Sequence, residues 1–381
     1  MSLPPLKLPS PLARPLRTGL LLTLTLWAVH SMERLGAQDR LHGENLLLTR
    51  QPDGTVAAAK TPEHWEGRRE EIARGFSSIV GNLPGEEKRC PLEVQVEEEV
   101  DCGSYQRRRI SYQSEPGCRV PAYLCIPKRL LEGTSEERTA SAVLCLHSTD
   151  DRAGYGLVVG LSDQPNLAYA SELAERGLVT IAPSYPLLAN YQPDLAALGW
   201  ESGTLKAVWD NQRAIDLLAS LPYVRPGPVG AIGHSLGGHN AVFTAFLDQR
   251  VGVVVSSCGL DSFLDYYDGN ERVWMPEKGW TQTRYMPRLA QYRGRLEQIP
   301  FDFPELVAGL APRPVLLIAP QRDENFRAAS VDRIAAAARP VFELSGKPER
   351  LRVLHPECGH DFPREMREAA YEWIEQAFRE R

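Results

Sequence analysis

The sequence predicts an α/β fold with a mostly parallel central sheet and helices on both faces. From residue 141 onward, short apolar runs alternate with helix-like segments, which is typical of the βα units that build a parallel sheet. Within that region the stretch 233–237, Gly-His-Ser-Leu-Gly, stands between a strand-like and a helix-like segment, where a sharp turn is required. Residues 92–127 contain three β-like runs, which we expect to open the sheet as antiparallel strands.

Each element of the alternating region follows from its residues. Buried strands are short and apolar, and such runs stand at 142–146, 179–182, 229–232, 251–256, 314–319 and 351–354. Helices are expected between them, at 166–176, 203–221, 238–248, 330–339 and 363–379. The last helix is amphipathic, with one apolar face made of Met366, Ala370, Trp373, Ile374 and Ala377.

The region ahead of the alternation has a different pattern. A helix is expected from His64 to about Val80, because Gly81 and Pro84 end the helical pattern. Three strand-like runs follow it, at 92–96, 105–112 and, after a turn at 115–117, 120–127.

We expect three parts along the chain: an export signal at 1–37, a lead-in with its helix at 38–90, and the main α/β domain at 91–381. In the signal, three basic residues precede the acid-free apolar run 18–29, and small residues at Ser31 and Ala37 offer cleavage sites. That run is too short for a stable membrane span, which needs about 20 residues. We therefore expect export to the periplasm or the extracellular space. The alternative is a cytoplasmic protein with an extended N-terminal tail.

Composition excludes several classes of protein. The chain has 381 residues, 43% of them hydrophobic, and a net charge of −6, which suits a large core and does not suit nucleic-acid binding. Seven scattered cysteines, none of them in a C-x-x-C pair, argue against a disulfide scaffold and a zinc ribbon. Without a cluster of His and Asp ligands, we expect neither a metal nor an organic cofactor. The oligomeric state stays open.

Ser235 is the candidate nucleophile. The G-x-S-x-G pattern between a strand and a helix holds a serine in a strained turn with its hydroxyl exposed above the sheet. Gly233 and Gly237 lack a Cβ, which lets the strand and the helix approach each other. The backbone N–H of Leu236, the next residue, is a candidate donor to an oxyanion.

A serine hydroxyl needs a base and a group that orients the base, and in this type of turn the chain order is Ser, then Asp or Glu, then His. Asp323 closes the segment after the strand at 314–319, and His360 lies in a loop just before the last helix. These are the candidate acid and base. Alternatives for the acid are Glu324, Asp261 and Asp265; the alternative base is His355.

Residues 259–303 interrupt the alternation and are rich in aromatic side chains. They follow a strand on the side where open α/β sheets bind ligands, so we expect a cap over the site, with Trp280 as a substrate-binding side chain. A packed surface insertion is the alternative.

Four segments together resemble the α/β-hydrolase superfamily, and within it the branch of dienelactone hydrolases and acetyl xylan esterases. They are Gly-His-Ser-Leu-Gly-Gly at 233–238, Leu-His-Ser-Thr at 146–149, Arg-Asp at 322–323 and Cys-Gly-His-Asp-Phe-Pro at 358–363. The resemblance covers about residues 90–381. Dienelactone hydrolases have a cysteine where Ser235 stands, so that activity is not implied.

The resemblance implies an α/β-hydrolase catalytic domain with a second oxyanion donor in the loop after the first parallel strand. In related sequences that loop reads His-Gly-x with x donating, which points to Thr149, and then to Ser148. Ser148 stands where glycine is usual.

The leading functional hypothesis is a serine ester hydrolase that acts through an acyl-enzyme on a small-molecule or carbohydrate ester, with small acyl groups such as acetyl preferred. A prolyl oligopeptidase-like serine peptidase is the alternative, although about 100 residues ahead of the main domain cannot build the β-propeller of those enzymes. A non-catalytic binding module is a third class. Such a module has no chemical need of a complete set of Ser, Asp and His, so the presence of all three argues against it.

Overall fold

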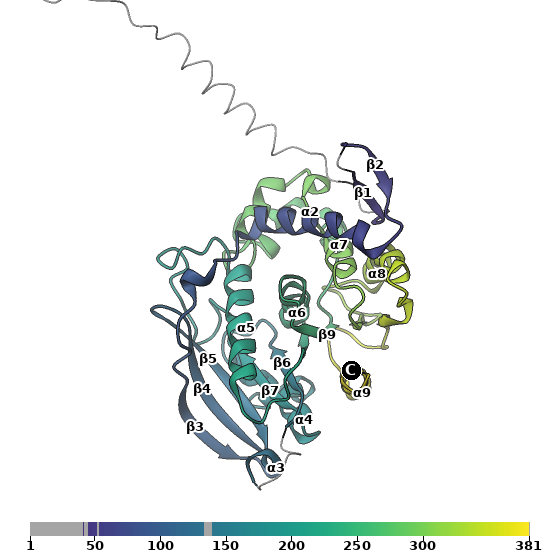
Figure 1. The fold of residues 1–381 in the computed structure, drawn as a ribbon. Helices are drawn as coiled ribbons and strands as arrows, with labels where there is room; N and C mark the ends of the chain where they lie inside the picture. The colour runs from purple at the N-terminus through teal and green to yellow at the C-terminus, as the bar shows by residue number, and fades with distance from the viewer. Residues whose placement is uncertain (1–40, 42–44, 52, 133–138, 381) are drawn as a thin grey trace, which may run out of the picture. The chain divides into compact units, whose positions relative to one another are not determined.

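The computed structural model describes residues 41, 45–51, 53–132 and 139–380 (Figure 1). The expected export signal at 1–37 lies outside these residues. Residues from Leu41 onward form one compact unit. No helix among the described residues is long and apolar enough to cross a membrane.

A nine-stranded sheet runs through this unit in the order β11-β10-β9-β8-β6-β7-β5-β4-β3. Six neighbouring strands are parallel: β6 (Ala142–Leu146), β7 (Val179–Pro183), β8 (Val229–His234), β9 (Val251–Ser257), β10 (Val315–Ile318) and β11 (Leu351–Leu354). The antiparallel part consists of β3 (Gln95–Asp101), β4 (Tyr105–Glu115) and β5 (Cys118–Pro127), with β5 joined antiparallel to β7. The expected sheet is confirmed, antiparallel at one edge and parallel elsewhere.

Helices cover both faces of the sheet. The helices are α2 (Pro62–Val80), α3 (Lys128–Leu131), α4 (Tyr169–Glu175), α5 (Gly203–Ser220), α6 (Leu236–Leu247), α7 (Phe303–Ala308), α8 (Ala328–Leu344) and α9 (Arg364–Arg379), and a separate hairpin joins β1 (Leu48–Arg50) to β2 (Val56–Ala58). Alternate residues of β6 enter two different cores: Leu144 packs with residues of α5 and α6, and Val143 with residues of α4 and α9. Successive side chains of a strand point to opposite faces of the sheet, and here both faces are buried. The parallel strands are therefore continuous apolar runs in the sequence.

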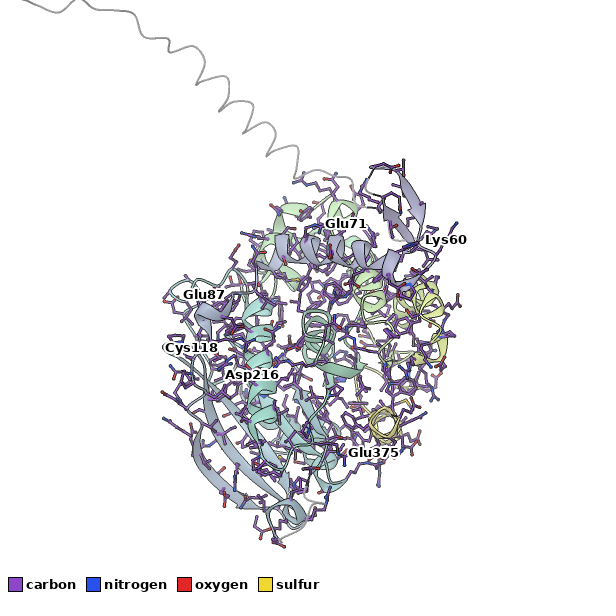
Figure 2. All side chains as sticks on the ribbon, viewed as in Figure 1. Lys60, Glu71, Glu87, Cys118, Asp216 and Glu375 are labelled. Atoms are coloured by element: carbon purple, nitrogen blue, oxygen red, sulfur yellow. The ribbon has the colours of Figure 1, made fainter. Side chains whose placement is uncertain are left out.

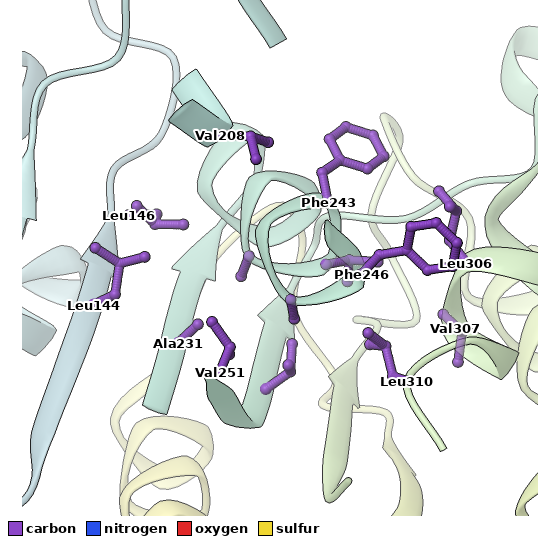
Figure 3. Packing of buried hydrophobic residues seen from close by; sticks show 14 of the residues in the cluster. Leu144, Leu146, Val208, Ala231, Phe243, Phe246, Val251, Leu306, Val307 and Leu310 are labelled. Carbon is purple, nitrogen blue, oxygen red and sulfur yellow. The ribbon is translucent and has the colours of Figure 1, made fainter. Parts of the chain in front are cut away.

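Side chains of α6 form the centre of the larger core. Phe243 and Phe246 project from α6, with Leu306 and Val307 of α7 nearby (Figure 3). Burying an aromatic side chain of this size stabilises the fold by about 1.5–3 kcal/mol. On the opposite face lies α9, which carries Glu375 (Figure 2). An ion pair of 2.6 Å joins Glu375 to Arg176, just after α4. The helix that follows the sharp turn, α6, is thus anchored by side chains buried in the larger core.

Two expected elements differ most in their bounds. The strand expected at 92–96 is found at Gln95–Asp101, because β3 is an exposed edge strand whose alternation does not reflect burial. The helix expected to end before Pro340 continues to Leu344. Val341 and Phe342 are buried just beyond the proline, and their burial offsets the backbone hydrogen bond that proline removes.

The segment between β9 and α7 contains short 3₁₀ turns: η4 (Tyr266–Gly269), η5 (Glu271–Trp274), η6 (Gly279–Thr281), η7 (Pro287–Tyr292) and η8 (Leu296–Gln298). The other 3₁₀ turns are η1 (Glu86–Lys88), η2 (Gly154–Val159), η3 (Pro165–Leu167) and η9 (Pro348–Arg350). α2 packs tightly against this segment, since a Cβ on Gly75 would lie 2.6 Å from the carbonyl oxygen of Pro300.

Candidate active site

Ser235 stands in the sharp turn between β8 and α6. Its backbone angles, φ 55° and ψ −120°, are strained for a residue other than glycine. The turn requires glycine on both sides: a Cβ on Gly233 would lie 2.2 Å from Gly237, and a Cβ on Gly237 would lie 1.9 Å from the carbonyl oxygen of Leu146. The backbone N–H of Ser235 donates to the carbonyl of Ser257 (2.8 Å), which anchors the turn to β9. Ser235 is only partly buried, unlike its neighbours His234 and Leu236.

Asp323 and His360 are brought together from the loops after two neighbouring strands, β10 and β11. Nδ1 of His360 lies 2.8 Å from Oδ2 of Asp323, whose side chain is fully buried. The other carboxylate oxygen, Oδ1, accepts the backbone N–H groups of Asn325 (2.8 Å) and Phe326 (3.1 Å). Burial alone would raise the pKa of Asp323, but the bonds from His360 and the two backbone N–H groups outweigh it and lower that pKa below its usual value. Asp323 is therefore a fixed carboxylate that orients the imidazole.

Nε2 of His360 is the nitrogen left to act on the serine, because Nδ1 is held by Asp323. Among the described residues, neither this Nε2 nor the Ser235 hydroxyl makes a hydrogen bond. Catalytic hydrogen bonds are often long before substrate binds and shorten in the complex. The ring of His360 lies 4.9 Å, centre to centre, from the ring of His234, the residue preceding the serine.

Asp265 and His355 have other partners, and the surroundings of Asp261 disfavour its ionised form. Asp265 pairs with Arg333 at 2.7 Å. Burial raises the pKa of Asp261 to about 6, so Asp261 is poorly suited to be a permanent carboxylate. Nδ1 of His355 lies 2.7 Å from the carbonyl oxygen of Ala319, and its Nε2 lies 2.9 Å from Asp332. His355 therefore links the end of β11 to the end of β10 and to α8, and both of its ring nitrogens are occupied.

The loop after β6 is held in place by a buried histidine. Nε2 of His147 accepts the backbone N–H of Tyr185 (2.9 Å), so its proton is on Nδ1, which donates to the carbonyl of Ser148 (2.7 Å). Burial lowers the pKa of His147 to about 4, which keeps it neutral. The Ser148 hydroxyl donates to the carbonyl of His234 (3.1 Å) and ties the loop to β8.

The two expected oxyanion donors come from this loop and from α6. The N–H of Leu236 belongs to the first turn of α6 and has no acceptor within the helix. Thr149 is exposed, and its hydroxyl lies 3.0 Å from the hydroxyl of Tyr285 in the segment 259–303. Sequence reasoning missed the role of Tyr285 in bridging to this loop, since nothing local distinguishes it from the other aromatic residues of that segment.

Trp280 lies in an aromatic cluster beside the candidate triad. Its ring is 4.6 Å from that of His239 on α6 and 6.3 Å from that of Phe326, which is in turn 5.9 Å from the ring of His360. Trp280 is only 3% exposed. Neighbouring rings cover most of its surface.

Three side chains among the described residues could in principle bind a metal ion. One ligand atom each of His234, Cys258 and His360 lie within 4.8 Å of one another. Burial raises the pKa of the Cys258 thiol well above its usual value, which opposes the thiolate form that a metal needs. His360 is already bonded to Asp323 through Nδ1. The closeness of His234, Cys258 and His360 is therefore explained better by packing around the candidate triad than by a metal site.

The chain is similar in sequence to known esterases and hydrolases. A family model for fungal glucuronyl esterases matches residues 198–346, a stretch that contains Ser235 and Asp323 and ends before His360. YtaP of Bacillus subtilis strain 168, whose name places it among hydrolases, is 27% identical over 252 residues, which are 64% of this chain and 78% of that protein.

Two solved structures share the fold. The glucuronoyl esterase from Solibacter usitatus has a TM-score of 0.67 at 17% identity and covers 88% of this chain and 97% of its own. The chain has the fold of an α/β-hydrolase. The acetyl xylan esterase from Paenibacillus sp. R4 has a TM-score of 0.55 at 16% identity, over 87% of this chain and 97% of its own. The fold that the sequence predicts is thereby confirmed.

The protein should lose stability in mild acid. Burial lowers the pKa of His147 to about 4, and those of His234 and His239 to about 3. The unfolded chain takes up these protons near pH 6.5, whereas the folded chain does so only near pH 3–4. Unfolding should therefore become easier by up to about 1.4 kcal/mol per pH unit for each histidine as the pH falls from 6.5 to 4.

Chemical denaturation at pH 7, 6, 5 and 4 measures this loss. The variant His239→Phe removes one of the three groups and should flatten the decline, while the exposed His64→Gln should not. An equally steep decline in all three proteins would contradict the assignment to buried histidines.

Proposed function

We propose that the chain is a serine hydrolase of carbohydrate esters, with Ser235 as nucleophile, His360 as general base and Asp323 as the group that orients the base. The observation that carries the proposal is the 2.8 Å contact between His360 and a fully buried Asp323, beside a strained serine turn. The family model for glucuronyl esterases, which are named for cleaving esters, supports the ester bond as the target.

The mechanism follows from these positions. Nε2 of His360 takes the Ser235 proton as Oγ attacks the carbonyl carbon, and the N–H groups of Leu236 and Thr149 stabilise the developing oxyanion. The imidazolium then gives its proton to the leaving alcohol as the ester C–O bond breaks, which leaves an acyl-serine. Water attacks the acyl group with His360 again as base, and the acid is released. Asp323 stays ionised throughout because its pKa is lowered.

Sugar acetates are the preferred substrate class, as the resemblance to acetyl xylan esterases first indicated. An alkoxide leaves more easily than an unprotonated amine, so a site with no acid devoted to an amine favours esters. Esters of uronic acids are the second candidate, which the match at 198–346 and the likeness to a glucuronoyl esterase favour.

A pH-stat assay tests the function over one panel: acetylated xylo-oligosaccharides, methyl glucuronate, p-nitrophenyl esters from acetate to decanoate, and aminoacyl amides. We expect turnover of a carbohydrate ester and a maximum at short acyl chains. Turnover of methyl glucuronate alone would move the assignment to the second candidate. A maximum at long chains would indicate a lipase-like carboxylesterase, and efficient amide cleavage would favour the peptidase alternative.

Trp280 is proposed to shape the substrate pocket from within the aromatic cluster. Because it is 3% exposed, Trp280→Ala should cost about 3–5 kcal/mol of stability, so it is a poor test of selectivity. Trp280→Phe keeps most of the packing and should change the ratio of kcat/KM for acetylated xylo-oligosaccharide and ethyl acetate.

Trp274 provides the matched control. It is a second buried indole of the same segment, packed on Phe263 and Tyr266 (5.8 and 6.1 Å between ring centres). Trp274→Phe should lower the melting temperature and leave the ratio unchanged. Equal behaviour of the two variants would favour the packed-insertion alternative.

Export remains part of the proposal, supported by the basic and apolar pattern of 1–37. Mass spectrometry of the mature N-terminus, with the native leader in a host that exports proteins, tests it. Processing after Ser31 or Ala37 is expected, and an intact N-terminus in the cytoplasm would contradict it.

A further inference from the structure

Tyr266 and Tyr267 are neighbours in the chain with opposite environments. Tyr266 is 9% exposed and packs into the aromatic cluster, whereas Tyr267 is 47% exposed. Their ring centres are 4.7 Å apart and their planes are nearly perpendicular, at 88°. The buried ring therefore supports the exposed one in an edge-to-face contact, and about half of Tyr267 is left open to solvent.

The backbone that presents Tyr267 is strained. Tyr267 (φ 48°, ψ 39°) and Asp268 (φ 54°, ψ 33°) both adopt the left-handed conformation, which residues other than glycine avoid. Asp268 is held by an ion pair of 2.5 Å to Arg327, and a side-chain N–H of the same arginine donates to the carbonyl of Asp265. Strain that the surroundings maintain in this way is concentrated at functional sites.

The exposed ring is also fixed at its far end. The hydroxyl of Tyr267 donates to Oδ1 of Asn325 (3.2 Å), and the backbone N–H of Asn325 donates to Asp323 (2.8 Å). The buried partner Tyr266 packs on Phe326 (6.1 Å), which packs on His360 (5.9 Å). Tyr267 is thus joined to the loops of both proposed triad partners of the serine.

We propose that Tyr267 is a stacking platform for a sugar ring of the substrate, at a subsite beside the one that binds the scissile ester. This inference rests on the proposed function and adds where the carbohydrate lies. A rigid tyrosine ring offers a large apolar face at little cost in conformational entropy, and the apolar C–H face of a pyranose matches it in size.

Tyr267→Asn is the most informative variant. Asparagine tolerates the left-handed conformation better than tyrosine, so the variant should fold with an unchanged or higher melting temperature while the ring is gone. We expect kcat/KM for acetylated xylo-oligosaccharides to fall about 10-fold, and that for triacetin, which has no ring, to change less than about 2-fold. Tyr267→Phe keeps the ring and should retain most of the activity. Leu264→Ala, at a position 51% exposed in the same segment, is the matched control and should change neither value.

Binding measured without catalysis separates this inference from the proposed function. In a Ser235→Ala background, calorimetric titration with xylohexaose and with hexagalacturonide should show that Tyr267→Asn weakens at least one of the two interactions about 10-fold. Absence of binding to either oligosaccharide, or equal binding by both proteins, would overturn the platform even if esterase activity is intact. Ring-dependent binding by a protein that cleaves no carbohydrate ester would uphold the platform and overturn the proposed function.

Discussion

Ser235→Ala is expected to lower kcat/KM for every ester substrate by about four to six orders of magnitude, with little change in stability. The hydroxyl is the only part of the residue that the proposed reaction uses, and alanine is no more strained than serine at φ 55°. The residual rate should still exceed that in water, because the donors of Leu236 and Thr149 remain. Steady-state kinetics beside a thermal melt measures both effects.

Ser220→Ala is the control for this experiment. Ser220 ends α5, and its hydroxyl donates to the carbonyl of Leu217 (2.7 Å). Its loss should leave the rate within about 2-fold. If Ser235→Ala retained more than about a hundredth of the wild-type rate, another group would have to be the nucleophile.

Asp323→Asn should lower kcat by about 10³–10⁴-fold in a protein that still folds. The amide oxygen can keep both backbone bonds, from Asn325 and Phe326, so that the amide NH₂ group faces Nδ1 of His360. Nδ1 would then have to accept, and the proton would sit on Nε2, where the base must be free. His360→Ala should have an equal or larger effect for the simpler reason that the base is absent.

His355→Ala is the matched control for the histidine. It removes contacts to Ala319 and Asp332, so it should cost about 1 kcal/mol of stability and leave kcat within about 3-fold. If Asp323→Asn kept near-normal rates, Asp261 or Asp265 would become the candidate for the acid that orients the base. Loss of activity in His355→Ala with activity retained in His360→Ala would reassign the base.

Much of the fold could be predicted because its signals are local. The apolar runs of the parallel strands, the glycines at 233 and 237 and the order of Ser235, Asp323 and His360 are all visible in the chain. Parallel strands end at one edge of the sheet, so loops that follow β10 and β11 had to meet there. The positions of Asp323 and His360 in the sequence were therefore enough to predict that their side chains meet.

Other features depend on contacts that no local pattern records. The strand β3 lies at an edge, where burial does not impose a register, and its expected position was wrong by several residues. The bridge from Tyr285 to Thr149 joins segments 136 residues apart. The difference between a buried Trp280 and an exposed Tyr267 likewise arises only when the segment 259–303 folds onto α6 and the loop after β10.

Covalent labelling with a fluorophosphonate tests most directly the claim that the chain is a serine hydrolase acting through Ser235. The wild-type protein should take up one equivalent of probe, lose activity in proportion, and carry the adduct on the peptide that contains Ser235. An acetylated xylo-oligosaccharide that is a substrate should slow the reaction. Labelling that persists in Ser235→Ala, or an adduct mapped to a different residue, would contradict the account.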